Sequence, residues 1–131
     1  MKKIVIVGAL GYLGTELCKI YSGESWRNKI IGIDNRFISE RVSQLKDWNI
    51  EFFQGHILDL EFLREHLFDA DIIHHLAGVT DVAFVRKKSS KELDEKIRSI
   101  AIDGTNNILK LSPKKCKIIF PSTHVVFEGF T

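Results

Sequence analysis

The chain has 131 residues, of which 44% are hydrophobic and 27% charged, and its net charge is +2. This length and composition suit one globular domain. The low charge and the scattered lysines and arginines argue against a nucleic-acid partner. No stretch approaches the roughly 18 apolar residues that cross a membrane, and the N-terminal apolar run is too short for a signal peptide. We therefore expect a cytoplasmic protein with no membrane partner.

Cysteine and histidine positions predict neither disulfides nor a metal site. Cys18 and Cys116 lie far apart and form no CxxC motif. Lone cysteines in apolar surroundings are typically buried thiols, which fits a reducing compartment. His74 and His75 are adjacent on a predicted strand, so their side chains point to opposite faces and cannot share a metal ion.

Short apolar runs alternate along the chain with longer amphipathic segments. The runs predict five strands at Ile4–Val7, Lys29–Ile33, Ile50–Phe53, Asp71–His74 and Lys117–Phe120. The segments between them predict helices, and short connections between alternating strands and helices favour parallel strands with right-handed crossovers. The expected fold is α/β, a Rossmann-type doubly wound parallel sheet with the strand order 3-2-1-4-5.

Polar residues mark where these helices begin. Ser39 is predicted to cap the second helix and Asp59 the third. A long last helix is expected to start at Ser89 or Ser90 and to stop before Pro113.

A glycine-rich turn joins the first strand to the first helix. Gly8, Gly11 and Gly14 form a GxxGxxG pattern in which the first permits a tight turn, the second lets a pyrophosphate approach the backbone, and the third lets the helix pack closely. Free N–H groups at the start of that helix, around Tyr12 and Leu13, favour phosphate binding. A flavodoxin-like turn, with glycines used only for packing, is the alternative.

An acidic residue ends the second strand. Asp34 lies 20 residues after Gly14, where a carboxylate can bind both ribose hydroxyls of NAD and repel the 2′-phosphate of NADP. Arg36 could instead pair with that phosphate, and Asp34-Asn35 could simply form a turn. We favour NAD as the cofactor.

With these elements placed, the chain resembles the extended short-chain dehydrogenase/reductase family, and within it the NAD-dependent sugar-nucleotide epimerases and dehydratases. The resemblance covers essentially the whole chain. It rests on the GxxGxxG spacing and on the segments Asp34-Asn35, Ile73–Gly78, Asp103–Leu109 and Pro121–Gly129.

The resemblance implies roles at the nicotinamide end of the cofactor. Leu76, Ala77 and Gly78 would line the nicotinamide ribose. Thr123 would be the active-site hydroxyl that bonds the reacting oxygen of the sugar and steadies it during hydride transfer. Ala101 stands where the family carries an asparagine, which removes one expected contact.

At the adenine end, the resemblance implies a backbone contact from Ile57. His56 stands where relatives usually carry an aspartate. It could stack on or bond the adenine, or face solvent.

The family's catalytic base is a tyrosine followed four residues later by a lysine. Here Tyr12 is followed at that spacing by Glu16, and Tyr21 by Ser25. We therefore expect residues 1–131 to be the NAD-binding Rossmann domain of a longer enzyme, without its C-terminal substrate lobe and inactive alone. Whether the protein forms a homodimer stays an open question.

The function expected of the intact protein is epimerisation or dehydration of a nucleotide sugar by transient hydride transfer. Two alternatives remain. A keto-sugar reductase of the same family is suggested by the segment Val126–Gly129. A non-catalytic NAD(P)-sensing module would lack the Tyr-Lys pair.

Overall fold

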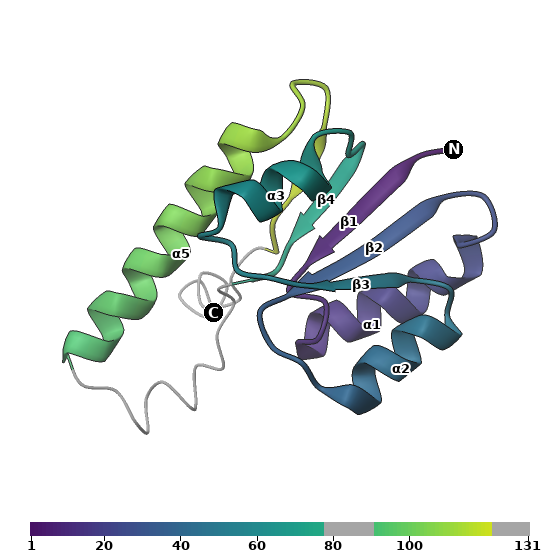
Figure 1. The fold of residues 1–131 in the computed structure, drawn as a ribbon, viewed down its shortest axis with the longest axis horizontal. Helices are drawn as coiled ribbons and strands as arrows, with labels where there is room; N and C mark the ends of the chain where they lie inside the picture. The colour runs from purple at the N-terminus through teal and green to yellow at the C-terminus, as the bar shows by residue number, and fades with distance from the viewer. Residues whose placement is uncertain (78–90, 122–131) are drawn as a thin grey trace, which may run out of the picture.

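A computed structural model describes residues 1–77 and 91–121. The elements in chain order are β1 (Lys3–Val7), α1 (Tyr12–Tyr21), the 3-10 turn η1 (Ser22–Glu24), β2 (Lys29–Asp34), α2 (Ser39–Asp47), β3 (Glu51–Gln54), α3 (Leu60–Leu67), β4 (Ile72–His75), α5 (Lys91–Leu111) and β5 (Lys117–Ile119). The strands pair in parallel in the order β3-β2-β1-β4-β5 (Figure 1). The predicted α/β fold and strand order are confirmed, with strand ends shifted by one residue.

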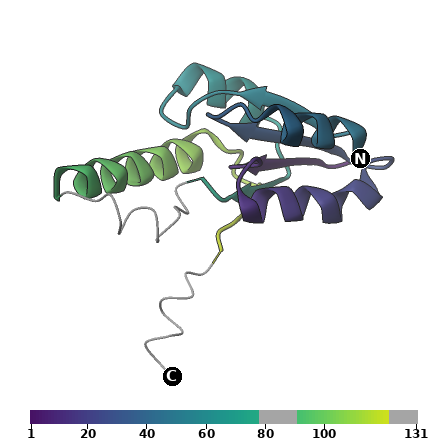
Figure 2. The same ribbon diagram turned by 90° about the horizontal axis from the view of Figure 1, so that it is seen from below.

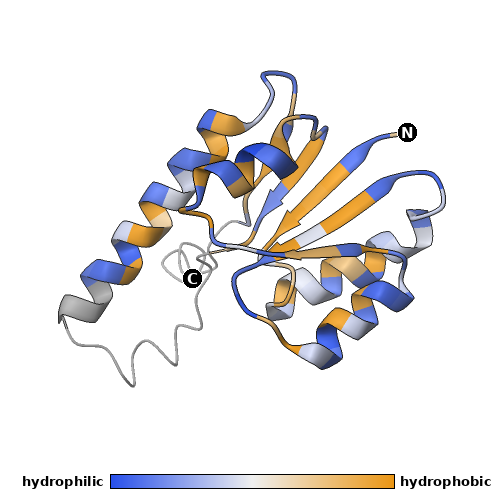
Figure 3. Ribbon diagram, viewed as in Figure 1, coloured by the Kyte–Doolittle hydropathy of each residue, from blue (hydrophilic) through white to orange (hydrophobic). Residues whose placement is uncertain are grey.

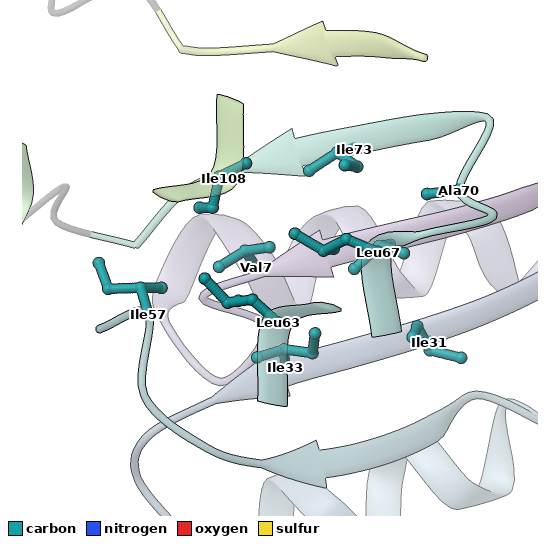
Figure 4. Close-up of a cluster of buried hydrophobic side chains, with 10 residues drawn as sticks. Val7, Ile31, Ile33, Ile57, Leu63, Leu67, Ala70, Ile73 and Ile108 are labelled. Carbon is teal, nitrogen blue, oxygen red and sulfur yellow. The ribbon is translucent and has the colours of Figure 1, made fainter. Parts of the chain in front are cut away.

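Helices cover both faces of the sheet. The two apolar cores place α1 and α2 on one side of the strands and α3 and α5 on the other (Figure 1); Figure 2 shows the same elements from below. Each side has its own apolar core. The α3 and α5 side is built on Val5, Val7, Ile31, Ile33, Leu63, Leu67, Ile73 and Ile108 (Figure 4). The α1 and α2 side is built on Ile4, Ile6, Leu10, Cys18, Ile30, Leu45 and Ile50.

Burial on both faces explains why the central strands are continuous apolar runs. Alternate residues of β1 enter opposite cores, so all four of Ile4–Val7 are buried. Figure 3 shows this as hydrophobic colour along β1 after its hydrophilic first residue, whereas the helices carry both hydrophobic and hydrophilic residues. Within the described ranges, no helix is long and apolar enough to cross a membrane.

One predicted helix cap is confirmed and one is wrong. The Asp59 carboxylate accepts a hydrogen bond from the Phe62 N–H at 3.1 Å and so caps α3. Ser39 does not cap α2, because the cap position is occupied by Ile38. Ile38 packs against the α1 and α2 core, and this contact makes the helix begin one residue earlier than predicted.

The two cysteines differ in burial. Cys18 lies inside the core, where burial raises the pKa of its thiol to about 12, as expected of a structural cysteine. Cys116 is only half-buried, so the prediction of a core thiol is wrong there. It lies in the turn before β5, at one edge of the described sheet, where fewer neighbours cover it.

Candidate functional site

The glycine turn lies at the carboxyl end of β1. Gly8 has φ +89°, and its N–H donates to the Ile33 carbonyl at 2.7 Å. A Cβ at this position would lie 2.8 Å from the Ala77 backbone nitrogen. Gly8 is therefore required both by its left-handed backbone and by the close passage of the segment after β4.

Gly14 lets α1 lie directly on this turn. A Cβ there would lie 2.1 Å from the Gly8 carbonyl oxygen and 2.8 Å from the Ala9 Cα. Both atoms belong to the backbone, so no side-chain movement could relieve the contact. Any larger residue at Gly14 would push the helix off the turn.

Gly11 differs from the other two glycines because the fold leaves space around it. It is the N-cap residue of α1 with an extended backbone, φ −74° and ψ 172°, and no side chain of the described residues caps the helix there. Among the described atoms, a Cβ at Gly11 would meet only Arg36 Nη2 and the Gly8 oxygen, each at 3.4 Å. The fold itself would therefore tolerate a side chain at this position.

The first turn of α1 presents backbone donors beside Gly11. The N–H groups at the start of a helix have no intrahelical acceptor, and the helix dipole places partial positive charge there. Tyr12 and Leu13 project outward from this turn, with exposed fractions of 80% and 48%. The arrangement suits a phosphate group.

Asp34 lies beside this turn, at the carboxyl end of β2. Its carboxylate is buried, and Oδ2 accepts a hydrogen bond from the Leu10 N–H at 3.0 Å. Burial alone would raise the pKa of Asp34, but hydrogen bonds from Arg36 and Leu10 outweigh it and hold the pKa below its ordinary value. The side chain is therefore a carboxylate at neutral pH.

Arg36 reaches back over this carboxylate. Its Nε donates to Oδ1 and its Nη2 to Oδ2 of Asp34, each at 3.0 Å, and its backbone N–H also donates to Oδ1 at 3.0 Å. The neighbouring Asn35 side chain is exposed, and its carbonyl accepts a hydrogen bond from Gln54 Nε2 at 3.2 Å.

The segment after β3 borders the same edge of the sheet. The Gly55 N–H donates to the Asp34 carbonyl at 2.9 Å, which holds this segment beside the end of β2. His56 is half-buried, and its Nδ1 accepts a hydrogen bond from the Leu58 N–H at 3.1 Å. Ile57 is buried, and its carbonyl accepts from Asn107 Nδ2 of α5 at 3.1 Å.

The segment after β4 completes the edge. The Leu76 N–H donates to the Val7 carbonyl at 2.8 Å, and Ala77 lies against Gly8. The structure thus brings the glycine turn, Asp34, Arg36 and the segment Leu76-Ala77 together. Gly78 and Thr123 lie outside the described residues, as do Ser89 and Ser90.

The two histidines that precede this segment face opposite ways, as predicted. His74 Nε2 lies 2.7 Å from the Tyr21 hydroxyl of α1. His75 Nε2 lies 2.8 Å from the Thr105 hydroxyl of α5. Burial lowers the pKa of both imidazoles, that of His75 to about 4.

Three polar contacts near the site were not foreseen from the sequence. Thr105 and Asn107 tie α5 to the ends of β4 and β3, and the Arg41 guanidinium donates to the Leu10 carbonyl. The segment Asp103–Leu109 contains the first two, but the sequence alone assigned them no partners. Helical spacing could have placed Thr105 beside the buried Ile108, three residues on.

A family comparison decides the relationship. The model of the 3-beta hydroxysteroid dehydrogenase/isomerase family matches residues 5–130. The chain belongs to this family. The predicted membership of the extended short-chain dehydrogenases/reductases is thereby confirmed.

Curated proteins with similar sequences include enzymes named for nucleotide sugars. A dTDP-D-glucose 4,6-dehydratase of Dictyostelium discoideum is 34% identical over an alignment that covers 97% of this chain and 30% of the relative. A UDP-glucose 4-epimerase of Mycoplasma genitalium is 25% identical over 98% of this chain and 38% of the relative. The chain thus spans about a third of the length of these family members.

Solved structures agree on the fold. A UDP-glucose-4-epimerase of Stenotrophomonas maltophila with bound NAD has a TM-score of 0.72 and 17% identity, covering 97% of this chain and 38% of that one. A dTDP-glucose 4,6-dehydratase of Bacillus anthracis in complex with NAD has a TM-score of 0.72 and 21% identity. The match covers 97% of this chain and 39% of the dehydratase chain.

Proposed function

We propose that residues 1–131 bind NAD and form the cofactor-binding part of an enzyme that epimerises or dehydrates a nucleotide sugar. One observation carries this proposal: the glycine turn and Asp34 meet at the carboxyl ends of β1 and β2, joined by the hydrogen bond from the Leu10 N–H at 3.0 Å. Phosphate-binding N–H groups and a ribose-binding carboxylate then belong to one site, as dinucleotide binding requires.

The adenosine half of the cofactor would lie over the ends of β2 and β3. The pyrophosphate would contact the start of α1, where Gly11 leaves room. The ribose diol would bond Asp34, flanked by Asn35 and Arg36, and the adenine would lie near His56 and Ile57. The preferred cofactor would be NAD because the negative charge of Asp34 disfavours a 2′-phosphate.

The nicotinamide half would lie near Leu76, Ala77 and Gly78. When bound, NAD supplies a hydride acceptor that returns the hydride later in the reaction. Thr123 would hold the reacting sugar oxygen by a hydrogen bond. The names of the relatives support a nucleotide sugar as the substrate.

A second candidate is a non-catalytic NAD-sensing module. Such a module would lack the Tyr-Lys pair in the intact protein; neither tyrosine within residues 1–131 is followed four residues later by lysine. Sensor and enzyme share the same nucleotide site, so both predict binding and only the enzyme predicts turnover in the intact protein.

The test of the binding site is a matched pair of glycine-to-valine variants. Gly11→Val places a branched side chain where the pyrophosphate would lie, and we expect NADH affinity to fall by about 100-fold or more because the phosphate can no longer reach the backbone. Gly23→Val is the control: a Cβ at Gly23 meets no described atom within 4 Å. NADH fluorescence titration gives the affinities, and circular dichroism checks the fold.

Two results would overturn the proposal. One is a folded Gly11→Val variant that binds NADH as the wild type does. The other is a wild-type chain with no saturable NADH binding.

A further inference from the structure

The carbonyl groups of the glycine turn accept hydrogen bonds from within the protein. The Gly11 N–H donates to the Gly8 carbonyl at 3.1 Å, and the Thr15 hydroxyl donates to the Ala9 carbonyl at 3.2 Å. The Gly11 carbonyl accepts the Thr15 N–H at 2.9 Å. A carbonyl oxygen carries partial negative charge, so one that turned toward a bound phosphate would repel it. Donors that hold these carbonyls therefore keep the turn suited to an anion.

The Leu10 carbonyl is held from another helix. Leu10 is fully buried, and a buried carbonyl without a donor is costly. Its donor is the guanidinium of Arg41 in α2, 31 positions away in the sequence. Leu45 lies one helical turn after Arg41 and is also fully buried, so the core fixes the helix that carries this guanidinium.

The peptide between Leu10 and Gly11 could rotate if this hydrogen bond were lost. Rotation by about 180° would move φ of Gly11 from −74° into the positive region, which glycine adopts about as readily as the negative one. It would also break the hydrogen bond from the Gly11 N–H to the Gly8 carbonyl. The turn would then lose the shape in which it presents the first N–H groups of α1. Arg41 opposes this rotation because it keeps the Leu10 carbonyl bonded inside the protein.

We infer that Arg41 is a positioning residue, which holds the glycine turn in its pyrophosphate-binding form through the Leu10 carbonyl. This inference rests on the proposed NAD site. Arg41 acts on the backbone rather than on the cofactor. A guanidinium suits that role because it is charged at any working pH and presents its donors in a rigid plane. Its charge-assisted hydrogen bond is also about twice as strong as a neutral one.

The first part of the experiment is an NADH titration of the full chain, of Arg41→Leu and of Arg41→Lys. We expect Arg41→Leu to bind NADH about 10-fold more weakly, since a hydrogen bond from a charged group no longer holds the turn. Arg41→Lys keeps a charged donor and should recover part of the loss. The control is Arg27→Leu, which removes the same charge from an arginine paired with Glu24 at 2.8 Å and should bind NADH as the wild type does.

The second part is amide hydrogen exchange without nucleotide, which separates positioning of the turn from contact with the cofactor. The Gly11 N–H should exchange about 10-fold faster in Arg41→Leu than in the wild type, because its bond to the Gly8 carbonyl opens more often. The amides of β1 and β2 should exchange at wild-type rates, which shows that the fold is intact. If Arg41→Leu does not fold, Arg41→Lys gives the same test with smaller changes in both measurements.

Unchanged NADH affinity in a folded Arg41→Leu variant would contradict the inference. Weaker NADH binding with unchanged exchange at Gly11 would contradict it too, since Arg41 would then act on the cofactor directly. An equal loss of affinity in Arg27→Leu would assign the effect to net charge and reject a positioning role. Failure of the NAD site itself looks different: the wild type would show no saturable NADH binding, or Gly11→Val would bind NADH normally.

Discussion

At the scale of single residues, His75 is a titratable side chain that is almost completely buried. It is 3% exposed, and its ring meets Phe120 edge-on with centroids 5.3 Å apart. Its Nε2 lies against Thr105, while its Nδ1 has no hydrogen-bond partner among the described residues. Burial keeps water away from the charged, protonated ring, and this lowers the pKa of His75 to about 4.

This shift predicts that acid destabilises the fold. The unfolded chain binds a proton near the ordinary histidine value of 6.5, whereas folded His75 does so only near 4. Stability is therefore complete above pH 6.5 and is lost as the pH falls toward 4, by up to about 3 kcal/mol. Urea unfolding between pH 7.5 and 4.5 measures this loss.

The variant His75→Gln isolates that contribution. It cannot titrate, so its stability should fall less between pH 6.5 and 4.5 than that of the wild type. Some dependence of the variant's stability on pH should remain, because burial also lowers the pKa values of His74 and His66. Equal slopes for the two proteins would show that His75 is not the group that acid attacks.

At the scale of elements, α5 docks on the loop after β3 through a glycine. A Cβ at Gly104 would lie 2.0 Å from Ile57 Cδ1 and 2.5 Å from its Cγ1. Three residues along the helix, Asn107 bonds the Ile57 carbonyl. The close approach and the hydrogen bond fix the loop that carries the proposed adenine contacts.

We therefore expect Gly104→Ala to destabilise the fold by about 1–3 kcal/mol through overpacking. Gly23→Ala, made in open space, should change stability by less than about 1 kcal/mol. Urea unfolding of the single variants, of Ile57→Ala and of Gly104→Ala/Ile57→Ala completes a double-mutant cycle. The double variant should lose at least about 1 kcal/mol less stability than the two single variants lose in sum, since the methyl group added at position 104 enters the space that the Ile57 side chain vacates. Additive costs would contradict the predicted clash.

At the scale of the whole molecule, parallel strands bring their carboxyl ends to one edge of the sheet, and every described residue of the proposed site lies at or near that edge. Cofactor binding would need only the residues at this edge of the sheet. Proton transfer by a tyrosine with a lysine four residues later needs a motif that residues 1–131 do not contain.

The 131-residue chain should consequently bind NADH without catalysing turnover. The measurement is product formation from UDP-glucose and dTDP-glucose in the presence of NAD, alongside NADH titration of the same sample. We expect saturable binding and no product. Turnover by a homogeneous preparation would mean that another group acts as the base.

Much of this molecule could be read from local patterns. The strand order follows from apolar runs separated by helices, because parallel crossovers allow few alternatives. The glycine turn follows from Gly8, Gly11 and Gly14, whose spacing matches one strand, one turn and the start of one helix. Asp34 could be placed at the end of β2 for the same reason: its position depends on neighbours in the sequence.

Contacts between distant segments could not be read in this way. The pairing of His75 with Thr105 joins residues 30 positions apart, and the contact of Gly104 with Ile57 depends on how α5 lies against the sheet. Ile38 displaced Ser39 as the cap of α2 because packing on the core outweighs a local capping preference. Arg36 lies two residues from Asp34 in the sequence, yet its hold on both carboxylate oxygens depends on the turn at Leu10 and Gly11, which fixes the direction that the carboxylate faces.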